Sequence, residues 1–481
     1  MASRRYTVLL ASALILVSWA RADGPSPAPT PGQCARYAEA VAQSIRDRHM
    51  PFGGVVDPIY SVAQTVTPAA ESYTRAGDSA IWTGHFLAAE AVRYGVTQDP
   101  RALDNVRAAL TAIGDMVRAP GTGVLARAVM DAPTEASSVE NEKPVRAAAA
   151  VSDLSATEPT EKPTAEKGTP ASWAAGMANE EAHSGVHSAK IPKCAWTAGE
   201  EVCSGERNVW WVGHSTRDQY AGVALGLALT LQNVPDAGVQ KRAGEIVTRL
   251  VDFLETHAWT IHATNGDWVK KPSWSIRNFP EAYWFIFTEY QVASLLQLAK
   301  KVNPDKYGKR YWWAYQLTKI LPMKSALWAQ TSGYQPKHYA AFNVAYAYWY
   351  ILLGLEQDAT KHRKLEEVYQ SLRPSIAQDQ NAHFNMLDRA LHAADQGHDA
   401  ETVSLLSSLL GKTRWNLTVD NTGHYDGKTA IPIAERINTD FLWQRHPGQL
   451  LSYGDGRIES ARIDFLLPYW LARQTGVIAG P

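Results

Sequence analysis

Carboxylates and cationic groups stand beside aromatic rings at three places where helical sequence begins. The first stretch runs from Gly77 to His85, the second from Trp210 to Tyr220, and the third from Arg277 to Trp284. A pair of carboxylates can move protons across a glycosidic bond, and a half-exposed aromatic ring can stack on a sugar. The candidate residues in these stretches are Asp78, Trp82, His85, Trp210, Trp211, Arg217, Asp218, Tyr220, Glu281 and Trp284.

Each carboxylate also has an ordinary structural explanation. Asp78 suits a helix N-cap, a role that contributes ~1 kcal/mol. Ser215 and Asp218 have the spacing of a capping box, and Glu281, next to Pro280, suits the positive end of a helix dipole. Capping does not require tryptophan at the same positions, so the set as a whole favours a site. We expect Asp78 and Asp218 to be the catalytic pair, with Glu281 third, and Arg217 to orient a hydroxyl-rich or anionic sugar.

A fourth group of residues supports an alternative chemistry. His338 precedes Tyr339, Asn343, Tyr346 and Tyr350, which share one helix face at i, i+4, i+7 and i+11. A polysaccharide lyase needs such a tyrosine or histidine base and groups that neutralise a uronic carboxylate. Packed core tyrosines are the more common explanation of this stripe. Lyase activity, and glycan binding without catalysis, therefore remain alternatives; as substrate-binding groups we include His338, Tyr339 and Asn343.

The composition limits the classes of partner. The chain has 17 Trp and 20 Tyr but only 10 Phe, so most rings carry a polar group at the edge, as sugar-binding rings do. With 47 basic and 48 acidic side chains the net charge is −1, which provides no long-range field to gather phosphates. We expect no nucleic acid partner. No group of Cys and His has zinc-binding spacing, so neither a metal nor another cofactor is expected.

The first residues indicate export. Arg4 and Arg5 precede an apolar run that ends at a small-x-small site, so residues 1–22 are expected to be a signal peptide. Residues 23–34 form a Pro-rich spacer. No later run approaches ~18 apolar residues, so no stable membrane insertion is expected after cleavage, and the protein should be periplasmic or secreted. Under oxidising conditions Cys194 and Cys203 would form a disulfide.

Helical periodicity dominates the rest of the chain, and strand signals are few. Short turns at 97–100 and 233–236 join helices into antiparallel hairpins. Residues 131–190 are rich in Ala, Glu, Pro, Thr and Ser, which predicts a low-complexity insertion that interrupts one domain over 35–481. We expect twelve helices, over residues 35–48, 78–95, 99–118, 215–233, 236–256, 280–302, 305–320, 338–356, 361–373, 383–396, 400–410 and 459–474.

The hairpins 78–117 and 218–254 resemble each other: both begin with Asp, turn at Asp-Pro or Pro-Asp, and end on a charged helix. An enclosed helix followed by a half-solvated one suggests two concentric rings. Residues 35–130 and 205–481 thus resemble the (α/α)6 six-hairpin toroids of glycosidases, polysaccharide lyases and sugar epimerases. The resemblance implies an all-α toroid whose inner-helix starts surround a central cup. It also implies an exported carbohydrate-active enzyme, foremost a glycoside hydrolase acting on a polysaccharide or oligosaccharide.

Overall fold

Two kinds of helix alternate along the chain. The computed structural model describes residues 30–132, 186–261, 282–320, 339–370, 372–438 and 445–480. In these ranges six helices lie inside, enclosed by the rest of the protein: α2 (Ser79–Thr97), α5 (Arg217–Asn233), α7 (Ala282–Val302), α10 (Tyr339–Gly354), α12 (Ala382–Leu391) and α14 (Ile463–Gln474). Six others cover them: α1 (Pro31–Ser44), α3 (Pro100–Arg118), α6 (Ala237–Thr256), α8 (Pro304–Ile320), α11 (Ala359–Tyr369) and α13 (Asp399–Leu410). All twelve predicted helices are therefore confirmed, with bounds shifted by a few residues.

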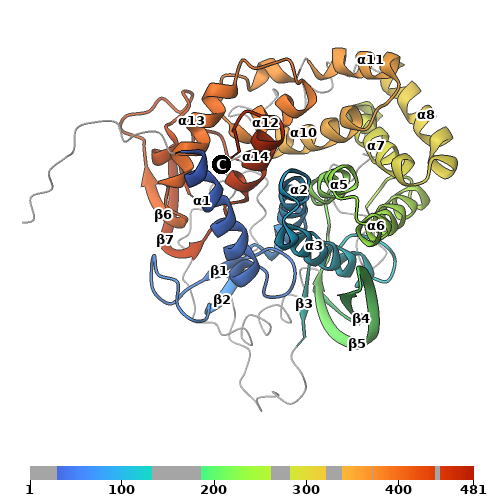
Figure 1. Cartoon of the computed structure of the whole chain (residues 1–481), viewed down its shortest axis with the longest axis horizontal. Coiled ribbons are helices and arrows are strands. Elements are labelled where there is room, and N and C mark those ends of the chain that lie inside the picture. The colour runs from blue at the N-terminus through green and yellow to red at the C-terminus, as the bar shows by residue number, and fades with distance from the viewer. Residues whose placement is uncertain are drawn as a thin grey trace, which may run out of the picture.

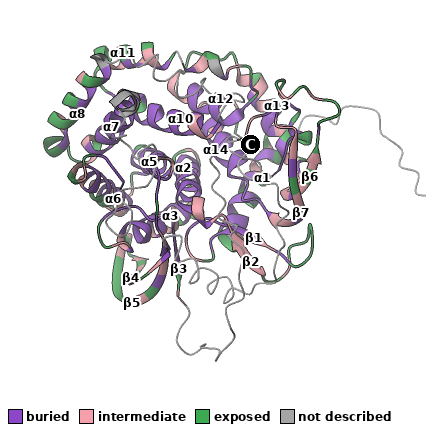
Figure 2. Ribbon diagram, turned by 180° about the vertical axis from the view of Figure 1, so that it is seen from behind, coloured by how far each residue is buried: buried purple, intermediate pink, exposed green. Residues whose placement is uncertain are grey.

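The hairpin turns form as their sequences predict. Asp99 caps α3, since its side chain accepts a hydrogen bond from the backbone N–H of Arg101 at 2.9 Å, and Pro100 occupies the first turn. Asp236 caps α6 in the same way through the N–H of Val239, also at 2.9 Å. Figure 2 shows the resulting contrast, with α2, α5 and α10 buried while α6 and α8 carry exposed outer faces.

The enclosed helices contact one another in series: α2 with α5, α5 with α10, α10 with α7 and α12, α12 with α14, and α14 with α2 (Figure 1). The closest approach is between α2 and α5. A Cβ atom on Gly84 would lie 2.2 Å from the carbonyl oxygen of Gly222, so only glycine permits this contact. The two helices run in the same direction, because the N–H of Ile81 donates to Gln219 at their starts and Gly95 meets Asn233 at their ends.

The expected all-α toroid is wrong, because the fold also contains two antiparallel sheets and is mixed α/β. One sheet has the order β2-β1-β7-β6 and the other β3-β5-β4. The strands are β1 (Asp57–Ile59), β2 (Ser72–Thr74), β3 (Ala128–Asp131), β4 (Val186–Thr197), β5 (Glu200–Val212), β6 (Trp415–Asp420) and β7 (Leu451–Glu459).

The longest strands, β4 and β5, form a hairpin that packs on α3 and α6 (Figure 1). Ala198 and Gly199 both have positive φ, which suits a two-residue hairpin turn. β4 begins at Val186, inside the range 131–190 expected as an insertion; 133–185 and 1–29 lie outside the described residues. The predicted disulfide between Cys194 and Cys203 is formed and joins the two strands. In the ranges that the structure describes, no helix is both long enough and apolar enough to cross a membrane.

Candidate functional site

Asp78 and Asp218 are both hydrogen-bonded to Gln219, Asp78 through the buried side chain and Asp218 through the backbone. The Gln219 amide nitrogen donates to Asp78 Oδ1 at 3.3 Å and to the carbonyl oxygen of Gly77 at 3.2 Å. The neighbouring carboxylate of Asp218 accepts the backbone N–H of the same Gln219 at 3.1 Å. The close packing of α2 on α5 thus brings together two acidic residues that are 140 positions apart in the chain.

A loop arginine connects the starts of the two helices. Arg127 donates from Nε to the carbonyl oxygen of His214 at 2.9 Å and from Nη1 to that of Gly77 at 2.8 Å. Its Nη1 also lies 3.9 Å from Asp78 Oδ1, and its Nη2 donates to the Thr216 hydroxyl at 3.5 Å. Arg127 therefore holds the two loops together and places a positive charge beside Asp78.

Asp78 does not cap its helix, and Asp218 lies within the first turn of α5 rather than at its N-cap. Asp78 occupies the N-cap position of α2, but its side chain makes no capping hydrogen bond. The N-cap of α5 is Thr216 rather than Ser215, and its hydroxyl donates to Asp218. The side chain of Asp78 is 22% exposed, and Asp218 is half-buried. Both carboxylates therefore combine hydrogen-bonded anchoring with partial access to solvent.

The aromatic residues predicted beside these carboxylates lie mostly in the core. Trp82 and Tyr220 are fully buried, and the Tyr220 hydroxyl accepts a hydrogen bond from the N–H of Leu125 at 3.1 Å. Burial raises the pKa of Tyr220. Trp211 is buried against His187, whereas Trp210 in β5 is half-buried.

The other predicted residues have varied placements. Arg217 is half-buried at the start of α5, and its carbonyl oxygen accepts a hydrogen bond from the Tyr348 hydroxyl at 3.2 Å. Glu281 and His338 lie outside the described residues. Trp284 belongs to α7, but its side chain is also outside the described part.

A buried histidine pair lies deeper between α2, α10 and α12. The ring centroids of His85 and His383 are 5.6 Å apart, and His383 Nε2 lies 3.2 Å from Asn343 Oδ1. Burial lowers the pKa of His85 to about 4 and that of His383 well below its usual range, where the nearby His85 adds to the effect. Both imidazoles are therefore neutral near pH 7 and serve as hydrogen-bonding groups between these three helices.

Tyr339 is engaged in a separate contact. Its hydroxyl donates to the carboxylate of Asp379, and burial together with that carboxylate raises the tyrosine's pKa. Tyr346 and Tyr350 are also buried, with pKa values raised by burial. The tyrosine face of α10 thus forms part of the core.

One trio of potential metal ligands is close enough to share an ion in the described ranges. It consists of Cys194, Glu201 and Cys203. The two sulfur atoms are bonded to each other, so they are not available as thiolate ligands. A groove of about 920 Å³ lies elsewhere, along α6, and contains none of the predicted catalytic residues. The helix-start carboxylates therefore remain the better candidate for chemistry, because they combine paired acids with neutral hydrogen-bond donors.

Sequence reasoning overlooked the residues that connect the two acids. Gln219 directly follows Asp218, so its position was visible, but its role depends on a contact with α2. Arg127 lies in a loop without any helical or motif signal. No family model, no curated protein and no solved structure matches this chain.

Proposed function

We propose that the protein is an exported glycoside hydrolase that acts on a polysaccharide or oligosaccharide. One observation carries the proposal: Asp78 and Asp218 begin two parallel, tightly packed helices and share Gln219 as a hydrogen-bonding neighbour. The export signal predicted in residues 1–22 and the abundance of tryptophan support a glycan outside the cytoplasm.

The two acids can divide the work of glycosidic hydrolysis. One carboxyl group protonates the leaving oxygen, and the other activates water or attacks the anomeric carbon. Gln219 and Arg127 hold Asp78 in place, while Thr216 orients Asp218. Arg217 stands one residue before Asp218 and would donate to sugar hydroxyls or to a carboxylate on the substrate.

The state of Tyr339 favours hydrolysis over elimination. A tyrosine base must give up its proton, and the raised pKa of Tyr339 beside Asp379 opposes that step. Its hydroxyl is also buried and already hydrogen-bonded. Elimination, and glycan binding without catalysis, are alternative outcomes of the experiment described next.

The test is a panel of neutral and acidic glycans assayed for two products. Hydrolysis releases reducing ends, whereas elimination creates a C4–C5 double bond that absorbs ultraviolet light. Asp78→Asn and Asp218→Asn should each lower turnover by about 10²–10⁴-fold, because the charge is lost while the shape is kept. Asp236→Asn is the matched control, since asparagine also caps a helix, and it should turn over substrate normally.

Three results would contradict the proposal. A panel with neither binding nor turnover excludes a carbohydrate substrate. Ultraviolet-absorbing products that persist in the Asp variants and vanish in Tyr339→Phe would indicate a lyase. Binding without any product, unaffected by the Asp variants, would indicate a glycan-binding protein.

A further inference from the structure

The groove along α6 is lined mainly by polar and charged side chains, as a binding site for a polar polymer would be. Its volume is about 920 Å³, and its walls come from α6, the end of α7 and the loop after α3. Threonine and glutamine side chains line it together with Lys241, Arg249 and Lys301. Arg249 and Lys301 are exposed and form no ion pair within the described ranges. The groove thus offers two cations, Arg249 and Lys301, that pair with no carboxylate in the described ranges.

The neighbouring helix α8 carries an exposed aromatic corner. Trp312 and Trp313 are 43% and 57% exposed, and their ring centroids are 4.8 Å apart at an interplanar angle of 80°. Lys309 lies one turn before them and is also exposed. Large apolar rings exposed side by side are typical of a surface that contacts a ligand or partner.

Ion pairs join these two features into one surface. Lys306 of α8 donates to Asp252, a groove residue, at 2.6 Å, and the Tyr307 hydroxyl donates to the same carboxylate at 2.7 Å. Arg310 pairs with Glu255, one turn further along both helices. Lys306, Arg310 and Trp313 fall at i, i+4 and i+7, so the tryptophan stands on the α8 edge that borders α6.

We propose that the α6 groove and the α8 tryptophans form a second, non-catalytic binding surface for an anionic polysaccharide. The proposal rests on the proposed function, since it takes the same class of polymer as ligand. Stacking of sugar rings on Trp312 and Trp313 supplies flat apolar contact. Arg249, Lys301 and Lys309 complement carboxylates along the chain.

Other occupants fit less well. A membrane-surface helix needs a broad apolar face, but among the α8 side chains that the structure describes, only the tryptophans and Leu317 are large, apolar and exposed. Single-stranded nucleic acid shares the negative charge of a polyuronate, and its binding is therefore an outcome of the test.

The test measures polymer binding apart from turnover, in the full-length Asp218→Asn protein. Affinity electrophoresis and calorimetry would compare polygalacturonate and alginate with neutral dextran, single-stranded DNA and phosphatidylglycerol vesicles. We expect retention on a polyuronate that weakens with salt. Trp313→Ala and Arg249→Gln should each weaken it by about 3- to 10-fold, the effect of one aromatic or one charged contact. Tyr453→Ala and Lys364→Gln, at other exposed positions, are the matched controls and should not weaken it.

The outcomes separate this inference from the proposed function. Unchanged polyuronate binding in Trp313→Ala and Arg249→Gln would overturn the second surface even if Asp218→Asn abolishes hydrolysis. Binding lost in those variants, with no glycan hydrolysed by the unmodified protein, would retain the surface and remove the hydrolase. Preference for dextran, DNA or vesicles would overturn it, as would dimerisation that depends on Trp313 without polymer binding.

Discussion

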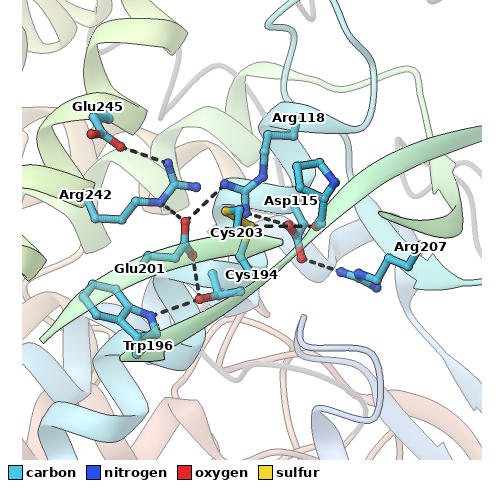
Figure 3. The surroundings of a disulfide bond; sticks show 11 residues. Asp115, Arg118, Cys194, Trp196, Glu201, Cys203, Arg207, Arg242 and Glu245 are labelled. Atoms are coloured by element: carbon cyan, nitrogen blue, oxygen red, sulfur yellow. Dashed lines mark hydrogen bonds and ion pairs between the residues drawn. A yellow bond between two sulfur atoms is a disulfide. The ribbon is translucent and has the colours of Figure 1, made fainter. Parts of the chain in front are cut away.

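The protein has two groups of carboxylates with opposite surroundings. Glu201 and Asp115 lie between the β4–β5 hairpin and α3, whereas Asp78 and Asp218 lie at the starts of α2 and α5. In β5, the side chain of Glu201 is 4% exposed and accepts a hydrogen bond from Thr111 at 2.8 Å, and Arg118 and Arg242 lie 3.2 and 2.8 Å from it (Figure 3). Asp115 of α3 pairs with Arg118 and Arg207 beside it. Each carboxylate oxygen of Glu201 and Asp115 has a partner, and the contacts of Glu201 and Arg207 hold the hairpin on α3 and α6.

The helix-start carboxylates have weaker and mostly neutral partners. Asp78 accepts from an amide, and the guanidinium of Arg127 lies 3.9 Å away. Asp218 accepts from a hydroxyl and a backbone N–H. A buried carboxylate whose oxygens are all taken by arginines and a hydroxyl is poorly placed to meet a substrate, whereas a partly exposed one anchored by neutral donors can still exchange a proton with it. The partner set, rather than the residue type, distinguishes structural from candidate catalytic acids.

The largest expected effect on stability is at the hairpin. Glu201→Gln weakens two charge-assisted contacts at once, although Arg118 keeps Asp115 and Arg242 keeps Glu245, so it should lower the free energy of unfolding by about 3 kcal/mol. Asp218→Asn should lower it by about 1 kcal/mol or less, because its contacts are neutral. Chemical denaturation of both variants measures the difference. Equal losses would remove the distinction drawn between the two groups.

Glu90 of α2 offers a third environment that sharpens the comparison. It is fully buried: Oε2 accepts from Arg93 at 3.1 Å and Asn105 at 2.8 Å, while Oε1 has no hydrogen-bond partner in the described structure. Burial raises the pKa of Glu90 from 4.5 to about 7. Because the folded state holds the proton more tightly, the stabilisation is complete below pH 4.5 and is lost as the pH rises to about 7.

The loss from Glu90 should amount to about 3 kcal/mol over that pH range. Glu90→Gln removes the titrating group, so its stability relative to the unmodified protein should increase from pH 4.5 to 7. Denaturation curves at several pH values measure this change. A stability difference that stays constant with pH would show that Glu90 is ionised throughout.

Opening the disulfide tests the hairpin without altering its charges. Cys194 and Cys203 close a short loop, with a sequence separation of 9, so a double serine variant should lose about 2–3 kcal/mol. Reduction of the unmodified protein should have a similar effect on its thermal unfolding. If neither treatment lowers stability, the ion pairs of Glu201 alone hold the hairpin.

The smallest effect concerns the packing that joins the helix starts. A Cβ atom on Gly222 would lie 2.8 Å from Ile81 Cα and 2.9 Å from its carbonyl oxygen. Gly222→Ala should therefore destabilise the fold by about 1–3 kcal/mol and move α5 away from Asp78. Gly308→Ala is the matched control in α8, where a Cβ meets nothing within 4 Å, and it should be neutral or gain about 1 kcal/mol. A neutral Gly222→Ala would show that α2 and α5 do not need this close contact.

The sequence by itself determined the helices, because their signals are local. Apolar residues recur at helical spacing, and Asp99 and Asp236 cap the helices that follow them. The distinction between enclosed and covering helices was also readable, since it depends on whether polar residues occupy one face or none. The acidic residues at the helix starts could be named for the same reason.

Only the tertiary structure decided the sheets and the connections within the site. β1 pairs with β7 through Ile59 and Ile458, nearly 400 residues apart, and such pairing leaves no local pattern. The Asp78 side chain accepts a hydrogen bond from Gln219 instead of capping α2. This contact is possible because glycines let α2 and α5 approach closely. The burial of Trp82 and Tyr220 likewise follows from neighbours supplied by distant segments. Local sequence sets the backbone conformation, but long-range packing determines which polar groups meet and which remain open to a ligand.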